Sequence, residues 1–263
     1  MIRKYLGLFA AFFRASLTAD LEFRANIAIR VCTDFMWYAA QISTFEVLYR
    51  QTTTIGTWTV GEVRVFLGIL FLVDAIYMVL FHDNMDHLSE KVRRGDLDLL
   101  LAKPINSQFM MSTQRMAPAY VINSLICISY LLWSFAHLEV ARPWWGLLWL
   151  FVLVPCGTMI VYCGRFFFSA MALIFTRAEY LGYLWYQLYR LGMRPDSIYF
   201  PWLKYLLLTA FPVGLIASVP SRAVLFPAEP LLFVWTILVT ALFIFLTTRF
   251  WRMALRQYSS ASS

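Results

Sequence analysis

Charged residues are scarce in this sequence. Asp, Glu, Lys and Arg make up 14% of its 263 residues, against about 25% in an average soluble domain. Hydrophobic residues make up 61%, and the mean hydropathy is +0.66. A soluble chain of this length cannot bury that much apolar surface in one core. The shortage of charge therefore excludes a soluble globular protein and indicates that lipid surrounds much of the chain.

The sequence also lacks a phosphate-binding loop, a large polar domain and a metal motif. No run has the form GxxxxGK[ST], in which backbone amides hold phosphates. The longest loop has about 30 residues, far below the size of a typical domain. Cys32, Cys127, Cys156 and Cys163 all lie in apolar segments, without the spacing of a metal knuckle or a disulfide scaffold. We therefore expect no cofactor in this chain.

Six segments are long and apolar enough to cross a bilayer, whose hydrocarbon core of about 30 Å needs about 20 apolar residues per helix. Four contain long runs without any charged residue, and the first two contain the acids Asp34 and Asp74. The sequence thus predicts an all-α polytopic membrane protein, with a single transmembrane domain over residues 1–263. The predicted spans are 26–49, 62–82, 113–137, 145–170, 203–220 and 229–249.

Basic residues are distributed unevenly between the predicted loops. With the N-terminus inside, 18 of the 22 lysines and arginines lie on the inner side, and the exceptions are Arg50, Arg64, Arg142 and Arg222. The positive-inside rule therefore predicts that both termini are cytoplasmic. The net charge of +7 is then explained by orientation and by anionic lipid headgroups, so no nucleic-acid partner is needed.

Two further segments are predicted to lie along the inner membrane surface. Residues 1–20 place their apolar side chains on one helical face, which is typical of an amphipathic interfacial helix leading into the first span. Residues 178–191 are rich in Tyr, Trp and Arg, which suit the headgroup layer.

The most strongly charged stretch is the loop at 83–112, between the second and third predicted spans. Gly95 can end a first helix, because glycine tolerates the left-handed conformation at a C-cap. Asp96 can then cap a second short helix that Pro104 ends. From the residues alone, this region fits an ordinary solvated loop as well as a specialised contact element.

The run VRRGDLDLLLAKPINSQF resembles the first cytoplasmic loop of the six-span permease subunits of type-2 ATP-binding-cassette exporters, in the branch of uncharacterised bacterial permease components. The matching residues are Arg94, Gly95, Leu97, Asp98, Leu101, Lys103 and Pro104. The interfacial helix, the six spans and a proline-broken end to the fifth span extend the resemblance over nearly the whole chain.

The resemblance implies a permease subunit in the bacterial inner membrane that exports its cargo. It would pair with a second permease subunit, either a copy of itself or a sister protein, and with a separate ATPase subunit that binds ATP and Mg²⁺. No residue of this chain would be catalytic, and the cargo is not indicated. The loop would carry a coupling helix that contacts the ATPase, formed by Glu90, Arg93, Arg94, Gly95, Asp96, Leu97, Asp98, Leu101, Lys103 and Pro104.

Charges inside the predicted spans are costly and usually have partners. Arg30 lies four residues before Asp34 on the same helical face, so these two can pair. We expect Asp74 to pair with Arg165 or with Arg30. Such pairs either fix the packing of the helices or form a polar point on the transport pathway.

His82, Asp83, Asp86 and His87 follow the second span with metal-ligand chemistry at i, i+4 spacing. A hydrated helix end is the favoured interpretation. The alternative functions are a membrane-embedded metal-dependent lipid enzyme built on this cluster and a non-transporting membrane scaffold.

The fifth predicted span is short and interrupted. Pro212, Gly214 and Pro220 fall within or just after it, and broken helices at membrane depth need protein or water partners for their freed backbone groups. The resemblance implies short re-entrant helices at the outer side, and residues 212–230 are the candidate. A kinked span with an irregular outer loop is the alternative.

Overall fold

The computed structural model describes residues 2–22, 24–138, 144–175 and 179–258. Within these ranges the chain is helical except for turns and one small hairpin, formed by β1 (Thr54–Ile55) and β2 (Trp58–Thr59), which pair antiparallel. Four stretches are long and apolar enough to cross a membrane: Val60–Val92, Pro118–Ala136, Trp145–Leu173 and Pro230–Gln257. The all-helical prediction is thereby confirmed, but the six predicted spans are not: the described ranges contain four candidate spans, or five if the bent pair Pro201–Leu208 and Pro212–Leu225 is one span.

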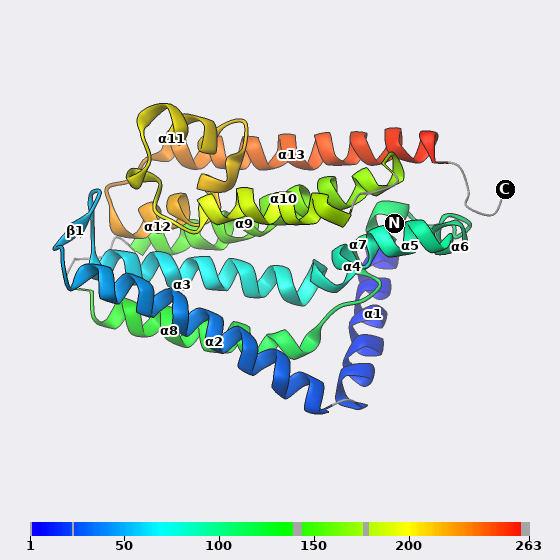
Figure 1. The fold of residues 1–263 in the computed structure, drawn as a ribbon, viewed down its shortest axis with the longest axis horizontal. Helices are drawn as coiled ribbons and strands as arrows, with labels where there is room; N and C mark the ends of the chain where they lie inside the picture. The colour runs from blue at the N-terminus through cyan, green and yellow to red at the C-terminus, as the bar shows by residue number, and fades with distance from the viewer. Residues whose placement is uncertain (1, 23, 139–143, 176–178, 259–263) are drawn as a thin grey trace.

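These stretches lie lengthwise beside one another, and the last of them runs along one edge of the bundle (Figure 1). Their helices are α3 (Val60–Tyr77), α8 (Val121–Ala136), α9 (Trp144–Ala170) and α13 (Pro230–Gln257). The predicted third span begins at 113, but the chain enters α8 only through a 3-10 turn, η2 (Pro118–Tyr120), with Pro118 at its first position. Proline suits that position because its missing N–H would have no helical partner there.

The helix α3 continues past the predicted end of its span. A π-helical turn, η1 (Met78–His82), leads into α4 (Asp83–Asp86) and then into α5 (Leu88–Arg94). The short helices α6 (Asp96–Leu101) and α7 (Ser107–Thr113) follow, and all of them lie at the same end of the bundle (Figure 1). We call this the α6 end, and the opposite end, with β1 and β2, the hairpin end.

The two N-terminal helices take different directions. The first, α1 (Ile2–Glu22), lies crosswise to the bundle at the α6 end, as an interfacial helix would (Figure 1). The second, α2 (Arg24–Tyr49), runs lengthwise beside the bundle and buries only Tyr38 and Phe45. With 26 residues at 1.5 Å per residue it is long enough to cross a membrane.

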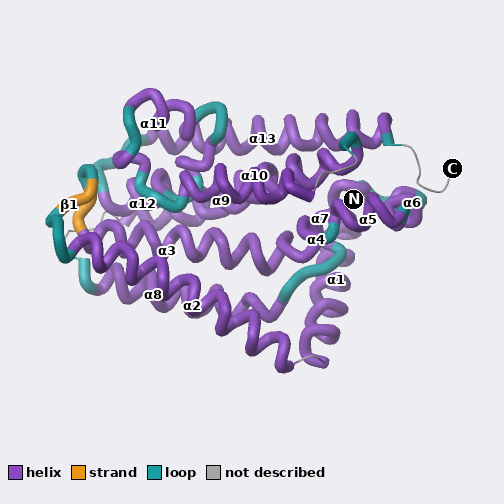
Figure 2. The backbone as a smooth tube through the Cα atoms, in the orientation of Figure 1, coloured by secondary structure: helices purple, strands orange, loops and turns teal. Residues whose placement is uncertain are grey.

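The position of α10 (Glu179–Gly192) differs from the prediction for 178–191. This helix runs lengthwise beside α9 instead of across the bundle end (Figures 1 and 2). Arg165 of α9 donates a hydrogen bond to the Gly182 carbonyl near the start of α10 (2.8 Å). The 3-10 turn after α10, η4 (Asp196–Ile198), packs its Ser197 against Gly56 of the hairpin. The helix therefore extends from the α6 end toward the hairpin end.

A buried stripe explains this position. Trp185, Tyr189 and Met193 recur every four residues, and each is at most 7% exposed. Helical residues four apart share one face, so these three form the side of α10 that packs on α9 and α3. Tyr180 and Tyr183 lie on the opposite, exposed side.

The segment that the sequence assigns to a fifth span is bent. It comprises α11 (Pro201–Leu208), the 3-10 turn η5 (Pro212–Leu215) and α12 (Ser218–Leu225), with an angle of 77° between the helix of 201–208 and that of 212–225. The buried carboxylate of Asp196 contacts Lys204 on the first limb (3.2 Å) and Arg222 on the second (2.7 Å). Both limbs therefore lie at the hairpin end, an arrangement that differs from one straight span over 203–220.

Candidate functional site

The projection formed by α5 and α6 lies at the α6 end, and Gly95 separates its two helices. Gly95 has φ 78°, in the left-handed region, and its N–H bonds the carbonyls that end α5. This is the predicted C-cap, because a residue with a Cβ is strained in that conformation. Asp96 is the first residue of α6 rather than its cap, so the predicted boundary moves by one residue.

The leucines of α6 divide between the protein and its surface. Leu97 is fully buried, whereas Leu99 is 73% and Leu101 36% exposed. Lys103 and Pro104 are exposed beyond the helix. Glu90 forms an ion pair with Arg94 on α5, and the side chain of Arg93 lies outside the described part. The projection thus combines exposed apolar side chains with a charged rim, which suits a protein contact.

Asn84 of α4, just before the projection, is bonded to α7 and to the residues that follow α7. Its side chain is fully buried. Its Nδ2 donates to the carbonyls of Ser112 (2.9 Å) and Arg115, and its Oδ1 accepts from the Arg115 N–H (3.0 Å). Sequence reasoning did not single out Asn84, because an asparagine among His and Asp residues at a helix end does not stand out.

The helix α7 is in turn attached to two long helices. The Tyr162 hydroxyl of α9 bonds the Ser112 hydroxyl (2.7 Å) and accepts from the side chain of Gln108 (3.2 Å). The Trp251 indole of α13 donates to the Ser107 hydroxyl (3.0 Å). Hydrogen bonds thus connect α7, and through Asn84 the projection, to α9 and α13.

The crosswise helix α1 is attached to the same segment. The ring of Tyr5 meets that of Phe109 edge-on at 4.9 Å. Further along α1, Ser16 accepts from the Met116 N–H (3.0 Å) and Asp20 from the Ala119 N–H (3.1 Å). The loop from 104 to 119 is thus held by α1, α9 and α13.

The intramembrane charges have partners other than those predicted. Arg30 reaches Asp83 (3.3 Å), 53 residues along the chain. Arg165 reaches Asp86. Asp34 and Asp74 accept hydrogen bonds from neutral groups: Asn123 Nδ2 donates to Asp34 (2.5 Å), and the Tyr189 hydroxyl donates to Asp74 (3.3 Å).

These pairings also engage the residues with metal-ligand chemistry. His82 meets Asp86 at 3.3 Å, as its spacing predicted, but Arg165 meets the same carboxylate and Arg30 meets Asp83. Over the described ranges, no group of three or more His, Cys, Asp or Glu side chains has the arrangement of a metal site. A metal-dependent lipid enzyme has no support from this geometry.

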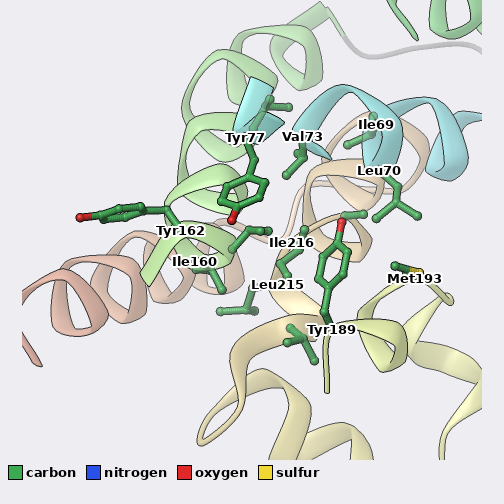
Figure 3. Packing of buried hydrophobic residues seen from close by; sticks show 14 of the residues in the cluster. Ile69, Leu70, Val73, Tyr77, Ile160, Tyr162, Tyr189, Met193, Leu215 and Ile216 are labelled. Atoms are coloured by element: carbon green, nitrogen blue, oxygen red, sulfur yellow. The ribbon is translucent and has the colours of Figure 1, made fainter. Parts of the chain in front are cut away.

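Helices α2, α3, α9 and α10 line a partly open cavity of about 490 Å³. Figure 3 shows two of its lining side chains, Tyr77 of α3 and Tyr189 of α10, with their rings in the space between the helices. Asp34 and Asp74 also line it. The only intramembrane carboxylates named by the sequence analysis thus share one cavity.

Membrane-length helices and a charged two-helix projection anchored to them define a multi-pass membrane protein. A family model described as ABC-2 family transporter protein matches residues 35–262, and the chain belongs to this family. Neither the curated proteins nor the solved structures include a match. The resemblance to type-2 ATP-binding-cassette permeases is confirmed, and such a membrane component works with an ATP-binding cassette and is generally not itself catalytic.

Proposed function

We propose that this chain is the permease subunit of an ATP-driven exporter, and that a separate ATPase subunit, which binds ATP and Mg²⁺, docks on α5 and α6. The observation that carries the proposal is the anchoring of this projection. Leu99 is exposed for a partner, while Asn84 and α7 connect the same element to α9 and α13. A lever that transmits force needs both a free contact face and stiff attachments.

The proposed topology has six crossings. Five are the helices α2, α3, α8, α9 and α13, and the sixth is a short crossing formed by the 14 residues of α10 together with the turn that follows it. Both termini are cytoplasmic in the bacterial inner membrane, and α11 and α12 form a re-entrant pair at the outer side that contains Pro212, Gly214 and Pro220. The lengthwise position of α10 and the two ion pairs of Asp196 support this assignment. In this topology Arg190, Arg194 and Lys204 lie on the outer side of the membrane. The inner side then has 15 of the 22 basic residues, which still satisfies the positive-inside rule.

In the proposed cycle, two permease subunits form the pathway between them. Closure of the ATPase subunits around ATP displaces the α5–α6 projection, and α7 carries the displacement to α9 and α13. The bundle then moves as a rigid body, which is the usual form of such transitions in transporters.

Purification of the chain with a co-expressed ATP-binding-cassette ATPase from the same genome tests this proposal. Leu99→Asp places a charge on the exposed apolar face of α6 and is expected to abolish co-purification. Thr53→Asp adds the same charge to an exposed position at the hairpin end and is expected to leave the complex intact. Full retention of the ATPase by Leu99→Asp would refute docking at α6.

A further inference from the structure

The cavity between α2, α3, α9 and α10 has a composition unlike the rest of the bundle. Besides Asp34 and Asp74, its wall contains seven aromatic side chains from three helices: Trp37, Tyr38, Tyr77, Tyr183, Trp185, Tyr186 and Tyr189. Its volume of about 490 Å³ falls within the range of about 300–1,000 Å³ that is typical of small-molecule sites. The wall is thus aromatic, with polar groups at few positions.

Carboxyl groups outnumber basic side chains in the cavity wall, which contains Asp34, Asp74 and Asp86 against Arg165 and His82. Both basic side chains meet Asp86, and Arg165 also donates to the Gly182 carbonyl. Asp34 and Asp74 have neutral hydrogen-bond donors, and among the described residues neither has a basic side chain within ion-pair distance. Among the described residues, the carboxyl groups of Asp34 and Asp74 therefore line this space without an ion pair of their own.

A buried hydroxyl supports the same interpretation. Tyr77 is 5% exposed and lines the cavity, and its hydroxyl has no hydrogen-bond partner among the residues that the structure describes. Buried polar groups normally have partners, so this hydroxyl is an unsatisfied polar group in a side chain of the cavity wall.

We propose that this cavity binds an amphipathic organic cation. The negative faces of aromatic rings attract a cation, and their apolar bodies accommodate an apolar substituent. The two carboxylates supply the countercharge, and an anion of equal size is excluded by them. Binding to the cavity is independent of the ATPase, whereas the role of this cation as the exported cargo rests on the proposed function.

A second hollow of about 570 Å³ adjoins the first, and Met193 lines both. It lies between α2 and α10, with Gln41, Ile55 and Arg190 among its lining residues. The two hollows thus follow the seam between α2 and α10 from the aromatic cavity toward the hairpin end. Arg190 and Arg194 at that end disfavour a cation there, which confines the binding site to the aromatic part.

Two probes of equal shape and opposite charge test the proposal. The purified chain in detergent micelles, without any ATPase, is dialysed against tetraphenylphosphonium or tetraphenylborate, and binding to protein-free micelles is subtracted. Saturable binding of tetraphenylphosphonium alone is expected. Equal binding of both ions, or no binding of the cation, would overturn the proposal.

Variants locate the binding. Asp74→Asn and Asp34→Asn keep the side-chain shape and are each expected to weaken tetraphenylphosphonium binding about tenfold, because one of two countercharges is lost. Glu46→Gln is the matched control, since Glu46 lies on α2 but pairs with Arg64 outside the cavity. Unchanged affinity in both aspartate variants contradicts the proposal.

If the aspartate variants do not fold, Tyr183→Leu gives the same information. Tyr183 lines the cavity but is 63% exposed, so its replacement removes an aromatic face at little structural risk. A loss of several-fold in cation affinity is expected, and unchanged affinity overturns the proposal. If the chain binds the cation but no ATPase, the cavity proposal stands and the proposed permease function is refuted. If the chain binds the ATPase but not the cation, the permease function stands and the cavity proposal is refuted.

Discussion

Replacement of Asn84 by alanine is expected to loosen the projection from the bundle. The buried amide of Asn84 makes three hydrogen bonds, two to carbonyls and one to an N–H of the segment 112–115. Each contributes about 1 kcal/mol net, and the backbone groups left behind have no water to replace it. The expected loss is therefore about 3 kcal/mol.

Asn106→Ala is the matched control. The Asn106 side chain caps α7 by a single exposed hydrogen bond from the Phe109 N–H (3.0 Å), and loss of such a cap costs about 1 kcal/mol. Thermal unfolding of the detergent-solubilised variants measures both effects, and trypsin cleavage within 91–103 reports loosening of the projection. An Asn84 variant no less stable than the Asn106 variant, with an unchanged cleavage rate, would show that the buried amide is not the anchor.

Three further predictions concern other parts of the fold. Asp196→Asn leaves Arg222 and Lys204 without their shared carboxylate, which is 1% exposed. Breaking a buried pair costs about 3–5 kcal/mol. The melting temperature of this variant should therefore fall well below that of Lys204→Met, which removes only the more exposed partner. Gly95→Ala places a residue with a Cβ at φ 78°, which costs about 1–2 kcal/mol, and should weaken ATPase co-purification. Gly7→Ala should not, because a Cβ added at Gly7 meets no atom within 4 Å. Equal complex yields from the two variants would contradict a role for the angle between α5 and α6. In a cysteine-free background, Arg194→Cys should react with an impermeant maleimide from outside the cell and Lys103→Cys only after permeabilisation, and the opposite pattern would refute the proposed topology.

The central helices could be predicted because lipid imposes a simple rule on sequence. Long apolar runs gave the positions of α3, α8, α9 and α13. The boundaries differ most at the start of α8, where Pro118 rather than hydropathy sets the boundary, and at the end of α13, which continues to Gln257. The break at Gly95 was equally visible, since the left-handed C-cap strongly favours glycine.

The path of α10 was not recognised from its composition. Tyrosine, tryptophan and arginine together are typical of the headgroup layer, and the helix has only 14 residues. The signal that could have corrected this prediction is the four-residue repeat of Trp185, Tyr189 and Met193, which marks a face for packing against protein.

The charge pairing could not be predicted from spacing along one helix. Arg30 and Asp34 have the right separation to pair, yet Arg30 binds Asp83 and Asp34 binds Asn123. Which partner a charge takes depends on how neighbouring helices are rotated, and hydropathy carries no information about that rotation.

The sparse burial of α2 has a consequence for how molecules reach Asp34 and Asp74. Of its 26 residues only Tyr38 and Phe45 are buried, so most of this wall of the aromatic cavity faces outward from the bundle. In the proposed topology, that outward face borders the hydrocarbon phase rather than either aqueous compartment. An apolar solute would then reach the two carboxylates laterally, from the bilayer leaflet in which it is already dissolved.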